Sequence, residues 1–156
     1  MHFVMDADCL IKLTKANLKE FVCTFYHVTL PETVRKEVID NAEGHTDAII
    51  IKTNIEKGLL NVDEHHSLTA KGEQSAISLY QKGGFDAVCS DDKRFINKLK
   101  LLGIPYVTPA VFVALLLREG KLTISEAERK LDALSPFISS DEYLTVQLSM
   151  KGWRVQ

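Results

Sequence analysis

Four acidic residues are the side chains in this sequence that are best suited to chemistry. Asp6 and Asp91 each follow a short apolar run, whereas Glu37 and Glu73 lie in segments whose apolar residues recur at helical spacing. If the fold brings these acids together, two carboxylates ~4 Å apart repel by roughly 4 kcal/mol at an effective dielectric of about 20. Protonation, a cationic side chain or a bound divalent metal ion can relieve that repulsion.

The same set of side chains indicates which metal and which reaction to expect. Carboxylate oxygens without clustered histidines or cysteines favour Mg²⁺ or Mn²⁺ over zinc. His65 and His66 are adjacent but have no further ligands at zinc spacing, so we expect them to be exposed in a loop. A metal ion with open positions binds a phosphodiester oxygen and activates a water molecule, and the sequence therefore predicts phosphodiester hydrolysis.

Each acid also has a purely structural explanation. Asp6 can cap the helix that follows it, and Glu37 can be a solvated acid on a helix surface. Glu73 can interact with the positive end of a helix dipole. The residues alone leave both explanations open.

The stretch VCSDDKR places two aspartates directly after an apolar run. Successive residues at a strand end point in different directions, so the two are not expected to serve one metal ion equally. We assign Asp91 as the ligand and Asp92 as the N-cap of the next helix, with a water-mediated metal contact for Asp92. Ser90 is a hydrogen-bonding neighbour, and Lys93 and Arg94 are candidates for phosphate contacts on a largely solvated helix face.

Short apolar or β-branched runs alternate with amphipathic segments along the first two thirds of the chain. The runs predict strands at residues 2–5, 21–30, 59–64, 85–90 and 104–107. The segments between them predict helices at residues 7–16, 31–42, 47–57, 72–82 and 92–103. From Pro109 onward the pattern is helical, with a capping box formed by Thr123 and Glu126.

This alternation predicts an α/β fold with a central, mostly parallel sheet, because parallel strands need crossover connections. Helices are expected on both faces of the sheet, followed by a helical extension over residues 109–156. The whole chain, residues 1–156, fits one domain. Ligands of such sheets bind at the carboxyl ends of the strands, which is the edge where Asp6 and Asp91 are expected.

The composition is ordinary for a globular protein. The net charge is −2, with 46% hydrophobic and 26% charged residues, so a polyanionic substrate needs a local cationic patch or a metal ion. The apolar start of the chain is too short for a signal peptide, and the stretch VFVALLL is too short to cross a bilayer. The cysteines, which lack zinc spacing, predict buried and reduced thiols in a cytoplasmic protein: Cys9, Cys23 and Cys89.

Motifs spread over most of the chain share the features of one known family. The stretch VMDADCLIKL is similar to that family's first motif, a hydrophobic strand followed by an aspartate and, two residues later, by hydrophobic residues. The stretch LPETVRKEV is similar to the helix of that family that begins with proline and carries the second acid. GEQSAISL resembles a helix of a bacterial and archaeal branch, and AVCSDDKR with LLGIPYV resembles the late strand, acid and following unit. The chain therefore resembles the PIN-domain family, single-domain metal-dependent ribonucleases that include many toxins of toxin–antitoxin pairs.

The resemblance implies a PIN-like three-layer α/β/α fold and endonucleolytic cleavage of RNA by metal-activated water, with Mg²⁺ or Mn²⁺ as cofactor. The implied catalytic cluster consists of Asp6, Glu37, Glu73 and Asp91. Metal contacts are assigned to Asp6, Asp91, Glu73 and Asp92, and substrate contacts to Arg94, Lys93 and Ser90. The sequence departs from many members at Asp8, where Asn or Ser is common, and at Glu73, where Asp is common.

The resemblance also implies partners. RNA is the expected substrate, a homodimer is the expected assembly, and a toxin role brings a cognate antitoxin that covers the acidic cleft. The alternative function is a noncatalytic RNA-binding or protein-interaction module on the same scaffold. That alternative is motivated by the lack of a strong basic patch and by the departures at Asp8 and Glu73.

Overall fold

The structure, a computed structural model, describes residues 1–40, 44–64 and 71–152 of the protein. His65 and His66, whose exposure the sequence predicts, lie outside the described residues, as does the end of the last predicted helix at Trp153. Within the described ranges, no helix combines the length and the apolar character that crossing a membrane requires.

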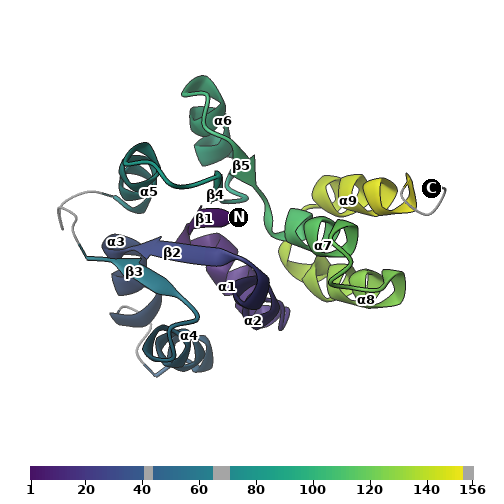
Figure 1. The fold of residues 1–156 in the computed structure, drawn as a ribbon, viewed down its shortest axis with the longest axis horizontal. Coiled ribbons are helices and arrows are strands. Elements are labelled where there is room, and N and C mark those ends of the chain that lie inside the picture. The colour runs from purple at the N-terminus through teal and green to yellow at the C-terminus, as the bar shows by residue number, and fades with distance from the viewer. Residues whose placement is uncertain (41–43, 65–70, 153–156) are drawn as a thin grey trace.

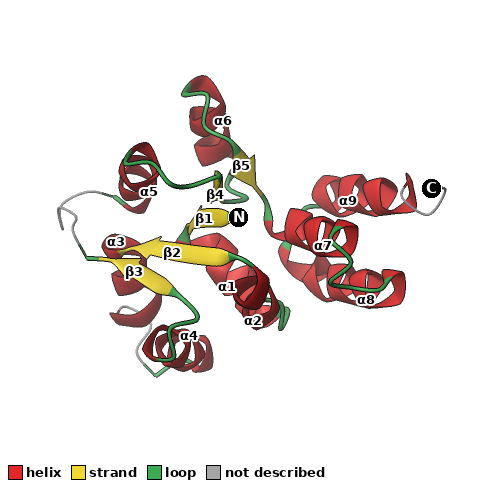
Figure 2. Ribbon diagram, in the orientation of Figure 1, coloured by secondary structure: helices red, strands yellow, loops and turns green. Residues whose placement is uncertain are grey.

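In the described part of the chain, five parallel strands form the sheet at the centre of the molecule (Figures 1 and 2). Their spatial order is β3-β2-β1-β4-β5, and every neighbouring pair is parallel. The strands are β1 His2–Met5, β2 His27–Pro31, β3 Asn61–Asp63, β4 Ala87–Cys89 and β5 Tyr106–Val107. The predicted α/β fold with a parallel sheet is confirmed.

Helices connect the strands and then continue alone to the end of the described chain. Between the strands lie α1 Ala7–Lys15, α2 Lys19–Phe25, α3 Glu32–Arg35, the π-helical turn η1 Lys36–Asp40, α4 Thr46–Glu56, α5 Gly72–Gln81 and α6 Lys93–Leu101. After β5 come α7 Pro109–Arg118, α8 Ile124–Leu134, the 3₁₀ turn η2 Ser135–Phe137 and α9 Ser140–Gly152. These last helices lie together beside the sheet in Figure 1.

The strands alternate their side chains between two hydrophobic clusters, as the pleat of a sheet requires. Phe3 and Met5 of β1 belong to the larger cluster, which also contains residues of α1, α2, α4 and α7 to α9. Val4 of β1 and Val88 of β4 belong to the smaller cluster, formed with α5 and α6. Helices thus cover both faces of the sheet, and the three-layer α/β/α arrangement is confirmed.

The apolar stretch VFVALLL forms most of α7 and is buried in the larger cluster. Phe112 of this helix lies edge-on to Phe3, with ring centroids 5.2 Å apart, and 6.0 Å from the ring of Tyr26. The following helix starts with the predicted capping box, since Thr123 and Glu126 each bond the other's backbone N–H. The helical extension is therefore attached to the sheet through the hydrophobic core.

Three local predictions differ from the structure. Residues 21–25, predicted as strand, belong to α2, because Leu18 and Val22 are both buried and their four-residue spacing suits a helix. The helix predicted over residues 31–42 is divided into α3 and the π-turn η1. The helix predicted from residue 47 begins one residue earlier, because Thr46 is the first residue of α4, and no side chain caps that helix.

Candidate active site

The strand order changes direction between β1 and β4. The chain moves from β1 to β2 and β3 on one side of the sheet and then returns to place β4 on the other side. A crevice forms at the carboxyl ends of two strands at such a switch point, and ligands of open α/β sheets bind there. Asp6 follows β1 and Ser90 follows β4 at this edge, with Met5 and Cys89 paired across the two strands.

Asp6 is held in place by backbone and side-chain hydrogen bonds. Its N–H donates to the Cys89 carbonyl at 3.0 Å, and its carboxylate Oδ1 accepts the N–H of Cys9 at 2.8 Å, so Asp6 caps α1. Burial raises the pKa of Asp6 to about 6, although hydrogen bonds from Ser90 and Cys9 oppose the shift. The sequence explanation of Asp6 as a helix cap is confirmed.

An open cavity of ≈ 380 Å³ lies beside Asp6 at the carboxyl edge of the sheet. Its carboxylate-bearing lining residues are Asp6, Asp8, Glu37, Glu73 and Asp92. They come from α1 and its cap, η1, α5 and the cap of α6, so segments far apart in the sequence meet there. We call this space the acidic pocket.

Glu37 and Glu73 both line the acidic pocket near the start of α5. The Glu37 Oε2 atom lies 3.6 Å from the position that a Cβ atom on Gly72 would occupy. Glu73 follows in the first turn of α5, and both glutamates are exposed. Glu37 belongs to the π-turn η1, and π-turns occur frequently at functional sites.

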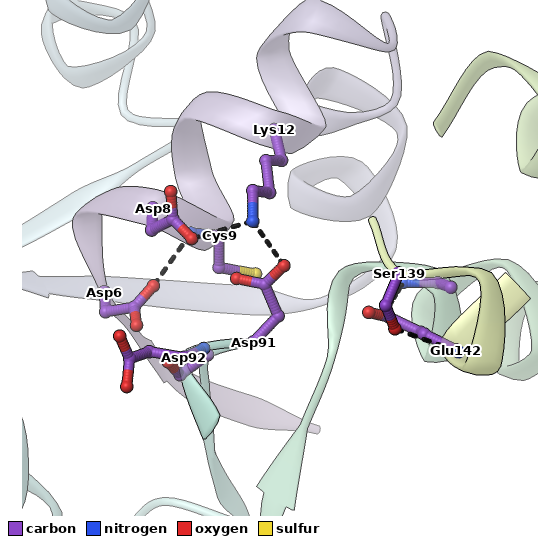
Figure 3. Close-up of polar contacts among 10 residues, drawn as sticks. Asp6, Asp8, Cys9, Lys12, Asp91, Asp92, Ser139 and Glu142 are labelled. Carbon is purple, nitrogen blue, oxygen red and sulfur yellow. Dashed lines mark hydrogen bonds and ion pairs between the residues drawn. The ribbon is translucent and has the colours of Figure 1, made fainter. Parts of the chain in front are cut away.

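The two adjacent aspartates after β4 have different surroundings. Asp92 lines the acidic pocket and also caps α6, accepting the N–H of Phe95 at 2.9 Å. Asp91 points toward Lys12 instead, as Figure 3 shows, and borders a separate hollow between α6 and α9. The expected divergence of the two side chains is present, but Asp92, rather than Asp91, lines the acidic pocket.

Lys12 forms ion pairs with Asp8, which lines the acidic pocket, and with Asp91, which does not. Its Nζ atom lies 2.5 Å from Asp91 Oδ2 and 2.9 Å from Asp8 Oδ2 (Figure 3). Burial, together with the nearby Asp8, raises the pKa of Asp91 to about 7, and the Lys12 ammonium opposes that shift. Sequence reasoning missed Lys12, although its position four residues after Asp8 on a predicted helix was a usable signal.

The remaining predicted site residues fall into two groups. Ser90 is fully buried, where its hydroxyl bonds the Asp6 carboxylate and accepts the Asp92 N–H at 3.2 Å, so it supports the two aspartates. Lys93 and Arg94 are exposed in the first turn of α6, directly after Asp92. Only this second group is available for contact with a substrate at the surface.

The acidic pocket suits a hard divalent cation through its oxygen donors. No three acidic, histidine or cysteine side chains of the described residues are gathered closely enough to hold a metal ion by themselves. Mg²⁺ does not require such a cage, because it usually keeps several waters and binds one or two carboxylates together with substrate phosphates. Five carboxylate-bearing residues around one open cavity meet that requirement.

Comparison with known proteins gives the family of the chain. A family model described as a PIN domain matches residues 2–148. The chain belongs to the PIN-domain family. A search of curated proteins finds no match.

Membership of the PIN-domain family agrees with both the fold and the position of the acids. The matched region includes all five strands and the acids Asp6, Glu37, Glu73, Asp91 and Asp92. PIN domains are typically nucleases and commonly bind divalent metal ions.

Proposed function

We propose that this PIN domain is a metal-dependent endoribonuclease whose active site is the acidic pocket. The observation that carries the proposal is the meeting of carboxylates from four separate segments at the switch point of the sheet. The residues we assign to hold a divalent ion, Mg²⁺ or Mn²⁺, are Asp6, Glu37, Glu73 and Asp92. Asp91 is assigned a supporting role because Lys12 already neutralises it.

Each residue of the pocket has a distinct task in this proposal. Asp6 is fixed by its hydrogen bonds to Cys9 and Ser90, so it presents a carboxylate of defined orientation. Glu37 and Glu73 are exposed, and their carboxylates can accept hydrogen bonds from water at the open side. A divalent ion bound there supplies a Lewis acid that polarises the phosphodiester and activates water.

The surface beside Asp92 is suited to a phosphate backbone. Lys93 and Arg94 extend from the first turn of α6, where the helix dipole adds positive potential. Two cations next to the acids draw the RNA strand toward the pocket even though the net charge of the protein is −2. RNA recognition in this proposal therefore depends on a local patch and a metal ion.

The proposal is tested by incubating the full chain with single-stranded and structured RNA, with Mn²⁺ or with a chelator. Cleavage is expected only with metal, and Asp6→Asn and Glu73→Gln are expected to abolish it. Glu56→Gln is the matched control, because Glu56 is an exposed helix acid outside the pocket. Cleavage that persists in Asp6→Asn comes from another nuclease or another site and contradicts the proposal.

A noncatalytic RNA-binding or protein-interaction module is the second candidate. The observation that favours it is that no three potential ligands of the described residues are already gathered around one point. The two candidates differ in a Mn²⁺ titration of metal-free protein. RNA binding without any Mn²⁺ binding at millimolar concentration supports the noncatalytic module, whereas saturable Mn²⁺ binding that Asp6→Asn removes supports the nuclease.

A toxin role, a cognate antitoxin and a homodimer stay predictions from the family resemblance. An antitoxin that covers the acidic pocket is expected to protect Lys93 and Arg94 from chemical modification. The assembly state is measured directly by light scattering of the full chain, with a mass of twice 17.5 kDa expected for a homodimer.

A further inference from the structure

Lys12 is a cation beside the acidic pocket that the proposed reaction does not use. It lies on α1, the helix that Asp6 caps, and its ammonium reaches two carboxylates from different parts of the chain. Asp8 is four residues earlier on the same helix, whereas Asp91 is 79 residues away and follows β4. Lys12 therefore joins α1 to the carboxyl end of β4 at the switch point of the sheet.

Asp91 depends on Lys12 for its neutralisation. Its side chain is only 7% exposed, and its Oδ1 atom is buried without a hydrogen-bond partner in the described part of the protein. A buried carboxylate without a counter-charge is costly, because water no longer stabilises its charge. The contact to Lys12 at 2.5 Å supplies that counter-charge.

Lys12 also offsets the repulsion between two neighbouring carboxyl groups, Asp8 and Asp91, because its ammonium contacts both. Two carboxylates ~4 Å apart repel by roughly 4 kcal/mol at an effective dielectric of about 20. A cation that contacts both carboxylates opposes this repulsion. A divalent metal ion bound between two carboxylates has the same effect. In this chain the bridging cation is a covalently attached ammonium.

We infer that Lys12 takes the place of a second metal ion and limits the site to one divalent cation. The inference rests on the proposed function, because it presumes that the acidic pocket binds one such ion. Lys12 is a positioning residue: it engages one carboxylate oxygen of Asp91 and one of Asp8 and leaves the metal to Asp6, Glu37, Glu73 and Asp92. Removing its charge frees two carboxylates, which then need another cation.

The test counts Mn²⁺ ions bound per metal-free full chain, from the loss of the free Mn²⁺ signal in electron paramagnetic resonance. The unchanged protein is expected to bind one ion. Lys12→Met and Lys12→Gln are expected to bind one ion more, and Lys12→Arg, which keeps the charge, is expected to match the unchanged protein. Lys52→Met is the control for loss of a lysine charge, since Lys52 is exposed on α4 outside the acidic pocket.

Circular dichroism shows which variants are folded. If Lys12→Met does not fold, the test uses Lys12→Gln, in which glutamine keeps one hydrogen bond to Asp91. The same number of ions with the same affinity in Lys12→Gln and the unchanged protein overturns the inference. A gain of one ion supports it even if no RNA is cleaved. RNA cleavage is measured separately, so failure of the nuclease proposal and failure of the Lys12 inference give different results.

Discussion

The burial of Asp6 couples the candidate site to the stability of the fold. Burial raises the pKa of Asp6 from 3.8 to about 6. The folded chain therefore holds the Asp6 proton more tightly than the unfolded chain does. The resulting stability is fully present below pH 3.8 and is lost as the pH rises through about 6. Above that range, the metal-free protein contains a buried charge that a divalent ion would compensate.

Asp6→Asn is expected to stabilise the metal-free protein at pH 8. The shift from 3.8 to about 6 corresponds to at most about 3 kcal/mol of unfolding free energy. Asparagine caps helices as well as aspartate does, so α1 keeps its cap. Urea unfolding at pH 4 and pH 8 measures the difference in unfolding free energy between Asp6→Asn and the unchanged protein. This difference is expected to be larger at pH 8.

Asp141→Asn is the control for this measurement, because Asp141 is exposed at the start of α9. Its effect is expected to stay within about 0.5 kcal/mol, as for most surface substitutions. Equal unfolding free energies of Asp6→Asn and the unchanged protein at both pH values would show that burial of the charged Asp6 carboxylate does not destabilise the protein.

Single-residue roles could be predicted where they depend on local sequence. The caps formed by Asp6, Asp92 and Thr123 follow from residue type and the start of a helix, and the structure contains all three. The orientation of Asp91 could not be predicted, because it depends on Lys12, which lies 79 residues away in the sequence. Sequence spacing shows that two aspartates diverge but not which one meets the distant acids.

Among the elements, α6 is the one that links the acidic pocket to the surface. Asp92 caps it, Phe95 and Leu99 bury one side of it, and its other residues are mostly exposed. The cations at its first turn are therefore held at a fixed place beside the pocket. This position makes α6 the element most suited to guide an RNA strand.

Lys93→Ala combined with Arg94→Ala is expected to weaken RNA binding and its salt dependence. Each lost phosphate contact lowers the slope of log K against log salt by about 0.7 for a single strand, so the pair lowers it by about 1.4. Fluorescence anisotropy at several salt concentrations measures the slope. An Asp6→Asn background prevents cleavage during the measurement.

The control for the α6 pair removes two cations elsewhere. Lys52 and Lys57 are exposed at α4, and α4 and α6 pack against opposite faces of the sheet. Their double substitution with alanine is expected to leave the slope nearly unchanged. An equal loss of slope in both double variants would mean that RNA binding is diffuse and does not depend on α6.

The order and type of most elements could be predicted from periodicity, whereas two details could not. The sequence of residues 21–25 is rich in strand-forming side chains, but burial at helical spacing makes it the end of α2. The π-turn that contains Glu37 lies inside a stretch whose sequence pattern indicates one continuous helix, so its position could not be predicted. Glu37 could be recognised as an acid on a helix, but its contact with the start of α5 could not.

At the scale of the whole molecule, one hydrophobic core joins the sheet to the C-terminal helices. The larger cluster extends from Phe3 in β1 to Met150 in α9. Phe112 is one of the residues that connect the two parts, because its ring meets the rings of both Phe3 and Tyr26. The extension therefore supports the strand that ends at Asp6.

Phe112→Ala is expected to lower the unfolding free energy by about 3–5 kcal/mol, the usual cost of removing a buried aromatic ring. Thermal unfolding followed by circular dichroism is expected to remain a single transition, since the sheet and α7 share one core. Two separate transitions, or a cost below about 1 kcal/mol, would show that the extension folds independently of the sheet.

The most direct test of the acidic pocket compares Asp92→Asn with Asp91→Asn in Mn²⁺-dependent RNA cleavage. The two substitutions are adjacent and chemically identical, and asparagine still caps α6 in the first. Asp92→Asn is expected to reduce kcat/KM by about 100-fold or more, whereas Asp91→Asn keeps most of the activity because Asp91 faces Lys12. Loss of cleavage in Asp91→Asn with full activity in Asp92→Asn would contradict the assignment of the metal to the acidic pocket.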